Sequence, residues 1–294
     1  MSPIGDSHAF LGGTVDLELV FLRDGVHLDG TELPFACANT EHGCGRSAPD
    51  GSVVPTYPIG AVRGAMRRIY AAVRSRKPDG LVNVHNSTCM TMPTLGWATS
   101  SWDGEQFQGV GKAIDVGSLL PLDTFRAEFM GRQWGLASEF LLAGEAYSFE
   151  QACAFSLLHD VPVRPNDLGK ELELMSRIWR AMDGFGREEA EWLPYWQNRR
   201  WVAPPPTGVC VSLYRDPRNG LLAVVANLGG NPATVCLRPR PVSGVQPPLA
   251  FLDSLASKPL VEAGDRVILS LPPLGWRLIR IAATSAADHP QTKE

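Results

Sequence analysis

The sequence predicts an α/β protein in two parts, a (β/α) barrel that lacks its N-terminal strands and a small antiparallel β-sandwich. Up to about residue 200, short apolar segments alternate with amphipathic ones, as in a parallel sheet covered by helices. After the three prolines of WVAPPPTG, residues 201–208, short alternating segments follow one another with Pro and Gly between them, which is typical of antiparallel strands. We therefore expect two domains, at residues 1–200 and 207–283.

The first domain is expected to begin with three strands and one long helix. The strands are GVHLD (25–29), LVNVHNS (81–87) and LGWATSSWDGE (95–105). Residues 57–76 place apolar side chains at helical spacing, and Pro78-Asp79-Gly80 ends that helix. A helix at 122–135 and a strand or short helix at 135–144 are expected next. Ser148 and Gln151 then have the spacing of a capping box at the start of another helix. The last helix is expected at 165–186, capped near Asn166 and ended by Gly184.

The second domain is expected to hold five strands. They are GVCVSLYR (208–215), LLAVVANL (221–228), ATVCLRP (233–239), DRVILSLPP (265–273) and GWRLIRIAA (275–283). The first two are joined by a turn that ends in Asn219-Gly220, a pair typical of tight hairpins.

Composition excludes some classes of protein. The 294 residues are 44% hydrophobic and 20% charged, with a net charge of −4, as in a globular protein with a sizeable core. No basic stripe could neutralise phosphates, so nucleic acid is not an expected partner. The most apolar run, Leu221 to Leu228, is far below the about 20 residues of a membrane span. No signal peptide is visible, which predicts a cytoplasmic protein as the sequence stands; an N-terminally truncated one would be extracellular or periplasmic.

Three of the expected strands close with a residue that can exchange protons. Asp29, His85 and Glu105 stand at or near the ends of the segments 25–29, 81–87 and 95–105. In a β/α barrel, the carboxyl ends of the strands meet on one face, where active sites lie. The recurrence of Asp, His and Glu therefore predicts an active site at this face.

The six cysteines contain no Cys-x-x-Cys pair, so neither a zinc ribbon nor a thioredoxin-type site is expected. Cys37, His42 and Cys44 are close enough in sequence to bind a metal, but thiols are also common as small buried apolar groups. We expect the second role, and we predict no metal and no cofactor.

Four motifs, taken in order, resemble an uncharacterised glycoside hydrolase-like family that is related to glycoside hydrolase family 123. They are DGVHLDGTE, CANTEHGCG, LVNVHNS and SSWDGEQF. The resemblance covers roughly Asp24 to Ile281 and implies a barrel followed by a β-sandwich, with residues 1–200 as the distal part of the catalytic domain. A full barrel takes about 250 residues, so the first strands would be missing. A chain that supplies them is then a candidate partner, beside the carbohydrate substrate.

The resemblance has two further consequences for the site. The β-N-acetylgalactosaminidases of family 123 use an adjacent Asp-Glu pair, and the nearest counterpart here is Asp103-Gly104-Glu105. The order Asp29, Glu105 and His159-Asp160 also resembles the strand-end residues of the α-amylase family. The alternative interpretation is that the segment LLHDVPV (157–163) ends a helix and begins a loop.

Most glycosidases need two carboxyl groups at the scissile bond. We assign Glu105 as the general acid and Asp29 as the nucleophile, the base or a charge-stabilising group. The alternative makes Asp29 a turn residue before Gly30 and Glu105 a loop carboxylate. The predicted function is a glycoside hydrolase that cleaves O-glycosidic bonds; its rival is a non-catalytic carbohydrate-binding or scaffold protein.

Further side chains are predicted to bind the substrate: His42, His85, Trp102, Asp103 and Asn39. Histidine and asparagine can hydrogen-bond sugar hydroxyls, and tryptophan offers an apolar face to the C–H groups of a pyranose. Asp103 is expected to point the same way as Glu105, because residues two apart on an extended segment share a face.

Overall fold

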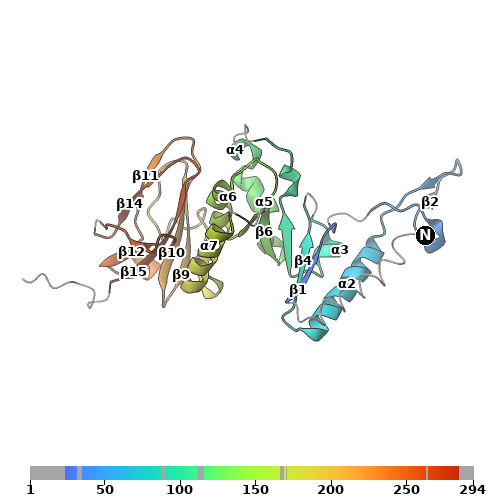
Figure 1. Cartoon of the computed structure of the whole chain (residues 1–294), viewed down its shortest axis with the longest axis horizontal. Helices are drawn as coiled ribbons and strands as arrows, with labels where there is room; N and C mark the ends of the chain where they lie inside the picture. The colour runs from blue at the N-terminus through green and yellow to red at the C-terminus, as the bar shows by residue number, and fades with distance from the viewer. Residues whose placement is uncertain are drawn as a thin grey trace, which may run out of the picture. The chain divides into compact units, whose positions relative to one another are not determined.

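The computed structural model describes residues 24–31, 35–87, 90–111, 116–165, 169, 171–262 and 264–284. The chain forms two compact units (Figure 1). The first unit comprises the residues up to Gln108 together with Ala127–Ala143, and the second comprises Gly109–Arg126 and the residues from Gly144 onward. The proline-rich segment lies inside the second unit. Independent folding of residues 207–283 stays a prediction.

The first unit is built on parallel strands that pair in the order β1-β4-β5-β6. Their bounds are Gly25–Leu28 for β1, Leu81–His85 for β4, Ser100–Asp103 for β5 and Ala137–Leu142 for β6. The parallel sheet is as predicted. Among the residues that the structure describes, this sheet is open at β1.

One face of this sheet is apolar and is covered by helix α2, Ile59–Arg76 (Figure 1). Met66, Ile69 and Val73 recur at helical spacing and are buried against Val82 and Val84 of β4. Because side chains alternate along a strand, the residues between these valines belong to the opposite face. The fold therefore leaves one face of the parallel sheet for chemistry.

Short elements complete this unit: η1 (Thr40–His42), β2 (Arg46–Ser47), β3 (Val53–Val54), α3 (Met92–Leu95), η2 (Glu105–Phe107) and η3 (Gly131–Trp134). Two predicted elements are divided in the structure. The strand expected at 95–105 is α3 followed by the shorter β5, and the helix expected at 122–135 is α5 (Leu122–Glu128) followed by η3.

The second unit contains two longer helices, α6 (Phe149–Ser156) and α7 (Leu172–Phe185). The predicted capping box is confirmed, since Ser148 and Gln151 satisfy each other's backbone N–H groups. Helix α7 ends at Gly186, whose φ of 82° suits glycine, rather than at the predicted Gly184. The predicted cap at Asn166 lies outside the described residues.

The rest of the second unit is antiparallel. One sheet has the order β13-β12-β15-β10-β9-β8 and another pairs β11 with β14. The five predicted strands correspond to β9 (Val209–Asp216), β10 (Gly220–Asn227), β11 (Ala233–Leu237), β14 (Val267–Leu271) and β15 (Trp276–Ala283). Three further strands were not predicted from the sequence: β8 (Glu191–Leu193), β12 (Leu249–Asp253) and β13 (Lys258–Pro259). Side chains of both sheets join one buried cluster, among them Leu221 and Leu269.

Among the described helices, none combines the length and the apolar character that crossing a bilayer requires.

Candidate active site

The face of the parallel sheet opposite α2 carries two rows of polar and aromatic side chains. The rows follow the strand register: His27, Asn83 and Ser100 pair across β1, β4 and β5, and His85, Trp102 and Glu139 pair across β4, β5 and β6. Asp29 follows β1 directly, beside the second row. The second row lies at the carboxyl ends of β4 and β5, as the sequence predicts for a site in a parallel sheet.

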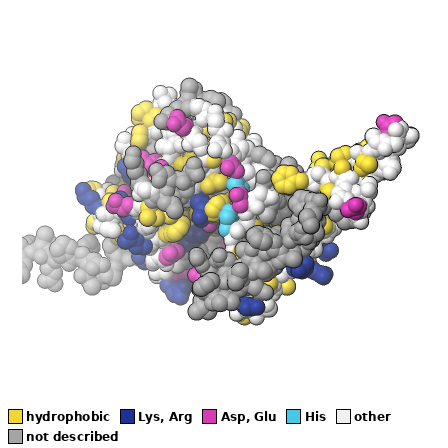
Figure 2. All heavy atoms as spheres, turned by 45° about the vertical axis from the view of Figure 1, so that its right-hand side comes forward, with side chains coloured by type: hydrophobic (Ala, Val, Ile, Leu, Met, Phe, Trp, Pro, Cys, Tyr) yellow, Lys and Arg dark blue, Asp and Glu magenta, His cyan; other side chains and the backbone are white. Residues whose placement is uncertain are grey.

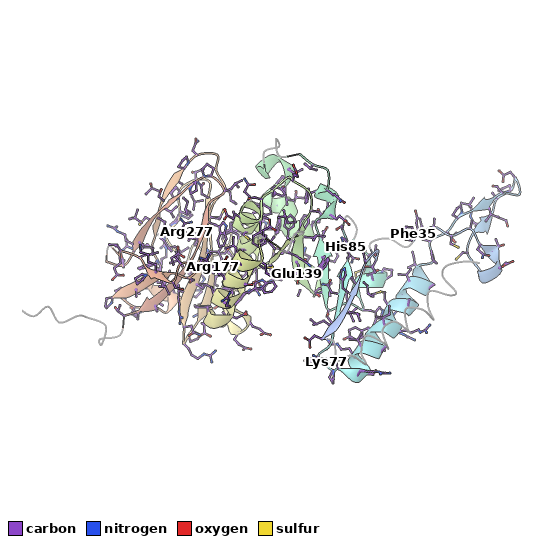
Figure 3. The ribbon with its side chains drawn as sticks, viewed as in Figure 1. Phe35, Lys77, His85, Glu139, Arg177 and Arg277 are labelled. Atoms are coloured by element: carbon purple, nitrogen blue, oxygen red, sulfur yellow. The ribbon has the colours of Figure 1, made fainter. Side chains whose placement is uncertain are left out.

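His85 links the two predicted carboxylates. Its Nδ1 lies 2.9 Å from Oδ1 of Asp29, and its Nε2 lies 3.2 Å from Oε2 of Glu105. The side chain of His85 is 8% exposed, whereas those of Asp29 and Glu105 are 82% and 48% exposed. Figure 3 shows His85 at the end of the strands that is far from Lys77. A buried imidazole thus holds two carboxylates that face solvent.

Local hydrogen bonds fix Asp29. Its Oδ1 accepts the N–H of Gly30 at 2.9 Å in addition to its bond with His85. The His85 hydrogen bond lowers the pKa of the Asp29 carboxyl, with smaller contributions from Gly30 and from nearby histidine charge. The hydroxyl of Thr31 donates to the backbone oxygen of His85 at 2.9 Å, which ties the turn after β1 to the end of β4. Asp29 is therefore ionised at neutral pH and held in place.

Glu105 is positioned through its backbone. A Cβ atom on Gly104 would lie 2.0 Å from the oxygen of Leu141, and φ of Gly104 is 142°, so only glycine suits this turn from β5 into η2. The Glu105 N–H then donates to Oγ of Ser87 at 3.0 Å, and the same oxygen lies 2.8 Å from Nε2 of His85. The turn therefore places Glu105 beside His85.

The predicted shared direction of Asp103 and Glu105 is not found. Asp103 is the last residue of β5 and is 1% exposed, whereas Glu105 is half-exposed in η2. The reason is the turn at Gly104, which interrupts the extended backbone that the prediction assumed.

His27 belongs to the same group, although it was not predicted from the sequence. Its Nδ1 lies 2.7 Å from Oδ1 of Asn83, and the amide nitrogen of Asn83 donates to Oγ of Ser100 at 2.8 Å. The His27 ring stacks on Trp102, with 3.9 Å between ring centroids. In Figure 2, histidine side chains lie at the surface beside acidic and hydrophobic ones.

The loop that follows Asp29 in sequence contributes less than predicted. Asn39 caps η1 by accepting the Glu41 N–H at 2.9 Å, and none of its described contacts reaches His85. The backbone of His42 lies in η1, and its side chain is outside the described part of the chain. Figure 1 shows β2, which follows η1, beyond the amino end of α2 and away from β4. Of the predicted residues, the structure brings together Asp29, His85, Trp102 and Glu105.

No protein-family model matches the chain, and no curated protein matches it. Among solved structures, the chain is similar to a GH27 β-L-arabinopyranosidase from Geobacillus stearothermophilus, with 12% identity and a TM-score of 0.56 over 96% of this chain and 62% of that one. A variant of the same enzyme, solved in complex with arabinose, matches with 11% identity and a TM-score of 0.56 over 95% of this chain and 62% of that one.

An Anoxybacillus α-amylase matches with 8% identity and a TM-score of 0.52 over 97% of this chain and 65% of that one. The chain thus spans less than two thirds of the length of these enzymes. All three are glycoside hydrolases, and the likeness shows that this chain has a glycoside hydrolase-like fold.

Proposed function

We propose that the chain is a glycoside hydrolase in which Glu105 is the general acid and Asp29 is the second carboxylate. The observation that carries this proposal is the placement of both carboxylates on the two nitrogens of His85, at the carboxyl ends of neighbouring parallel strands. Glycosidic cleavage needs one carboxyl group that donates a proton and another that attacks or activates water. The similarity in fold to known glycoside hydrolases supports the same class.

Asp29 is the nucleophile or the base of this proposal, because its carboxyl is ionised and faces solvent beside His85. His27 and Trp102 add aromatic surface next to the carboxylates, which suits the C–H groups of a sugar.

Glu105→Gln tests the acid. The variant keeps the shape of the side chain but cannot donate a proton, so hydrolysis of unactivated glycans should fall by about 10²–10⁴-fold. Aryl glycosides with good leaving groups should be affected much less, whereas Asp29→Asn should slow both kinds of substrate. Glu41→Gln is the control, because Glu41 is exposed in η1. A Glu105→Gln protein that cleaves an unactivated glycan at the wild-type rate contradicts the assignment.

The rival proposal is a non-catalytic carbohydrate-binding protein. The parallel sheet that is open at β1 among the described residues favours it, because a glycosidase barrel surrounds its site with strands. Glycan binding by the wild type without turnover, and loss of that binding in Trp102→Ala, would support the rival. The hydrolase proposal includes three further points. Strands from a partner chain would close the barrel, the second unit would contain a β-sandwich, and the chain would be related to family 123.

A further inference from the structure

We propose that His27, Asp29 and His85 bind one divalent transition-metal ion, with zinc as the best fit. Each residue offers one donor atom, and the three atoms lie within 4.8 Å of one another. Two imidazoles and one carboxylate form a donor set that suits zinc and its first-row neighbours, whereas magnesium and calcium prefer oxygen donors alone. The inference concerns the binding of an ion and does not depend on hydrolase activity.

The hydrogen bonds of the groups around the proposed ion site leave one nitrogen of His27 available to an ion. The amide nitrogen of Asn83 donates to Ser100, so its oxygen is the atom that faces Nδ1 of His27. That oxygen can only accept, and Nδ1 of His27 therefore carries the proton. Nε2 of His27 is then the nitrogen that can offer a lone pair to a metal ion. Outer hydrogen bonds of this kind set the tautomer and the orientation of histidine ligands in metal sites.

His85 shows the complementary arrangement. Its Nδ1 faces Asp29, and its Nε2 faces the hydroxyl of Ser87 and the carboxylate of Glu105. With an ion on Nδ1, Nε2 would carry the proton and donate it to these oxygens, which is the carboxylate–histidine–metal pattern. The buried His85 would be the fixed ligand of the site.

Small movements would complete the coordination. Zinc bonds to nitrogen and oxygen are about 2.0–2.2 Å long, so donor atoms of a tetrahedral site lie about 3.3 Å apart. Asp29 and His85 are already 2.9 Å apart. The remaining adjustment falls on the side chains of His27 and Asp29, which are both exposed. The ion would replace the Asp29–His85 hydrogen bond, and its fourth position would stay open to solvent.

A bound ion would also take up the carboxylate that hydrolysis needs. This consequence rests on the proposed function: an Asp29 that coordinates zinc cannot act as a base, so zinc should inhibit turnover and a chelator should restore it. Binding is measured separately from activity, so that a failure of the hydrolase proposal leaves the zinc result interpretable.

The experiment uses the full chain, stripped of metal with a chelator and titrated with zinc chloride by isothermal calorimetry. Cys37→Ser/Cys44→Ser serves as the parent, because these two thiols could bind zinc themselves. We expect one ion per chain in this parent, at least a 100-fold loss of affinity in Asp29→Asn and His27→Phe, and about a tenfold loss in Asn83→Ala. Phenylalanine keeps the stacking on Trp102 while it removes the donor. Asp50→Asn, an exposed turn residue, should bind like the parent.

Cobalt chloride gives an independent readout, because its visible absorption reports the number of ligands. Asp29 and His27 are exposed, so their variants should fold, which circular dichroism will check. The proposal is overturned when zinc binding disappears in the Cys37→Ser/Cys44→Ser parent, because the ion then belongs to the thiols. It is equally overturned when Asp29→Asn and His27→Phe bind zinc as tightly as the parent.

Discussion

Two buried histidines of this chain each lie near an aspartate, and they differ in the partners that they contact. In the first unit, His85 contacts the exposed carboxylates of Asp29 and Glu105. In the second unit, His159 is 1% exposed and contacts the oxygen of Phe155 through Nδ1 at 2.6 Å. The first arrangement presents charge to solvent, whereas the second satisfies a buried polar group. Exposure and the choice of partners, rather than the residue type, separate a candidate site from a structural contact.

The residue that follows His159 repeats the contrast. Asp160 forms an ion pair with Arg187 at 2.5 Å and accepts a hydrogen bond from the Tyr214 hydroxyl at 2.7 Å. It also has a positive φ of 62° and ends η4 (Leu157–His159). The segment LLHDVPV therefore ends a helix, as one of its two interpretations predicted. His159-Asp160, the pair whose order in the chain resembles that of the α-amylase family, therefore lies in a structural network of buried and partly buried contacts.

The largest effect on stability is expected at Asp160. Asp160→Asn removes the charge that pairs with Arg187 and weakens the acceptor of the Tyr214 hydroxyl, in a partly buried setting. We expect a loss of about 3 kcal/mol in the free energy of unfolding, at the lower end of the range for broken buried pairs, because Arg187 remains one third exposed. Urea unfolding followed by circular dichroism measures it.

The matched variant in the first unit is Asp29→Asn. Asp29 is exposed, so its stability change should stay within about 0.5 kcal/mol, even though it should abolish the chemistry of the site. Equal destabilisation by the two variants would remove the distinction between the two aspartates.

A smaller effect follows from the pH dependence of His159. Burial lowers the pKa of His159 from 6.5 to about 4, and Arg126 contributes in the same direction. Between these two pH values the unfolded chain binds a proton that the folded chain does not. The stability from this residue is therefore fully present above pH 6.5 and is lost as the pH falls towards 4. Between pH 7 and pH 5 the loss should be about 2 kcal/mol.

His159→Gln provides the comparison for this prediction. Glutamine does not titrate, so the slope of stability against pH should decrease in the variant whatever its stability at pH 7. An unchanged slope would show that His159 does not titrate as its burial implies.

Part of the candidate site could be predicted from strand ends alone. Asp29 and His85 stand where apolar segments stop, and parallel strands bring their carboxyl ends to one edge of a sheet. The same alternation could have revealed His27 and Asn83, since each lies two residues before one of these side chains and so shares its face. The prediction from strand ends includes neither of them, because it uses only the residues at which the strands close.

Other features depend on the tertiary structure and have no local signal. The turn at Gly104 separates Asp103 from Glu105 because the Leu141 backbone packs against it, and Leu141 is distant in sequence. Asn39 lies in a polar loop that looks like the rim of a site, but its side chain caps η1. Only the packed chain distinguishes such a cap from a ligand-binding group.

A smaller effect than those of Asp160 and His159 is expected at Ser87, a residue that also had no signal of its own. Its hydroxyl accepts the Glu105 N–H and contacts Nε2 of His85, and its side chain is buried. Ser87→Ala should lower the free energy of unfolding by about 1 kcal/mol and reduce turnover less than Glu105→Gln does, since the acid remains but loses its anchor. Ser75→Ala is the matched control, because Ser75 is exposed in α2 and alanine favours a helix by about 0.5 kcal/mol. If Ser87→Ala unfolds at the same urea concentration as Ser75→Ala and retains full turnover, then the backbone of Glu105 does not depend on this hydroxyl, and the exposed site of the first unit is held by His85 alone.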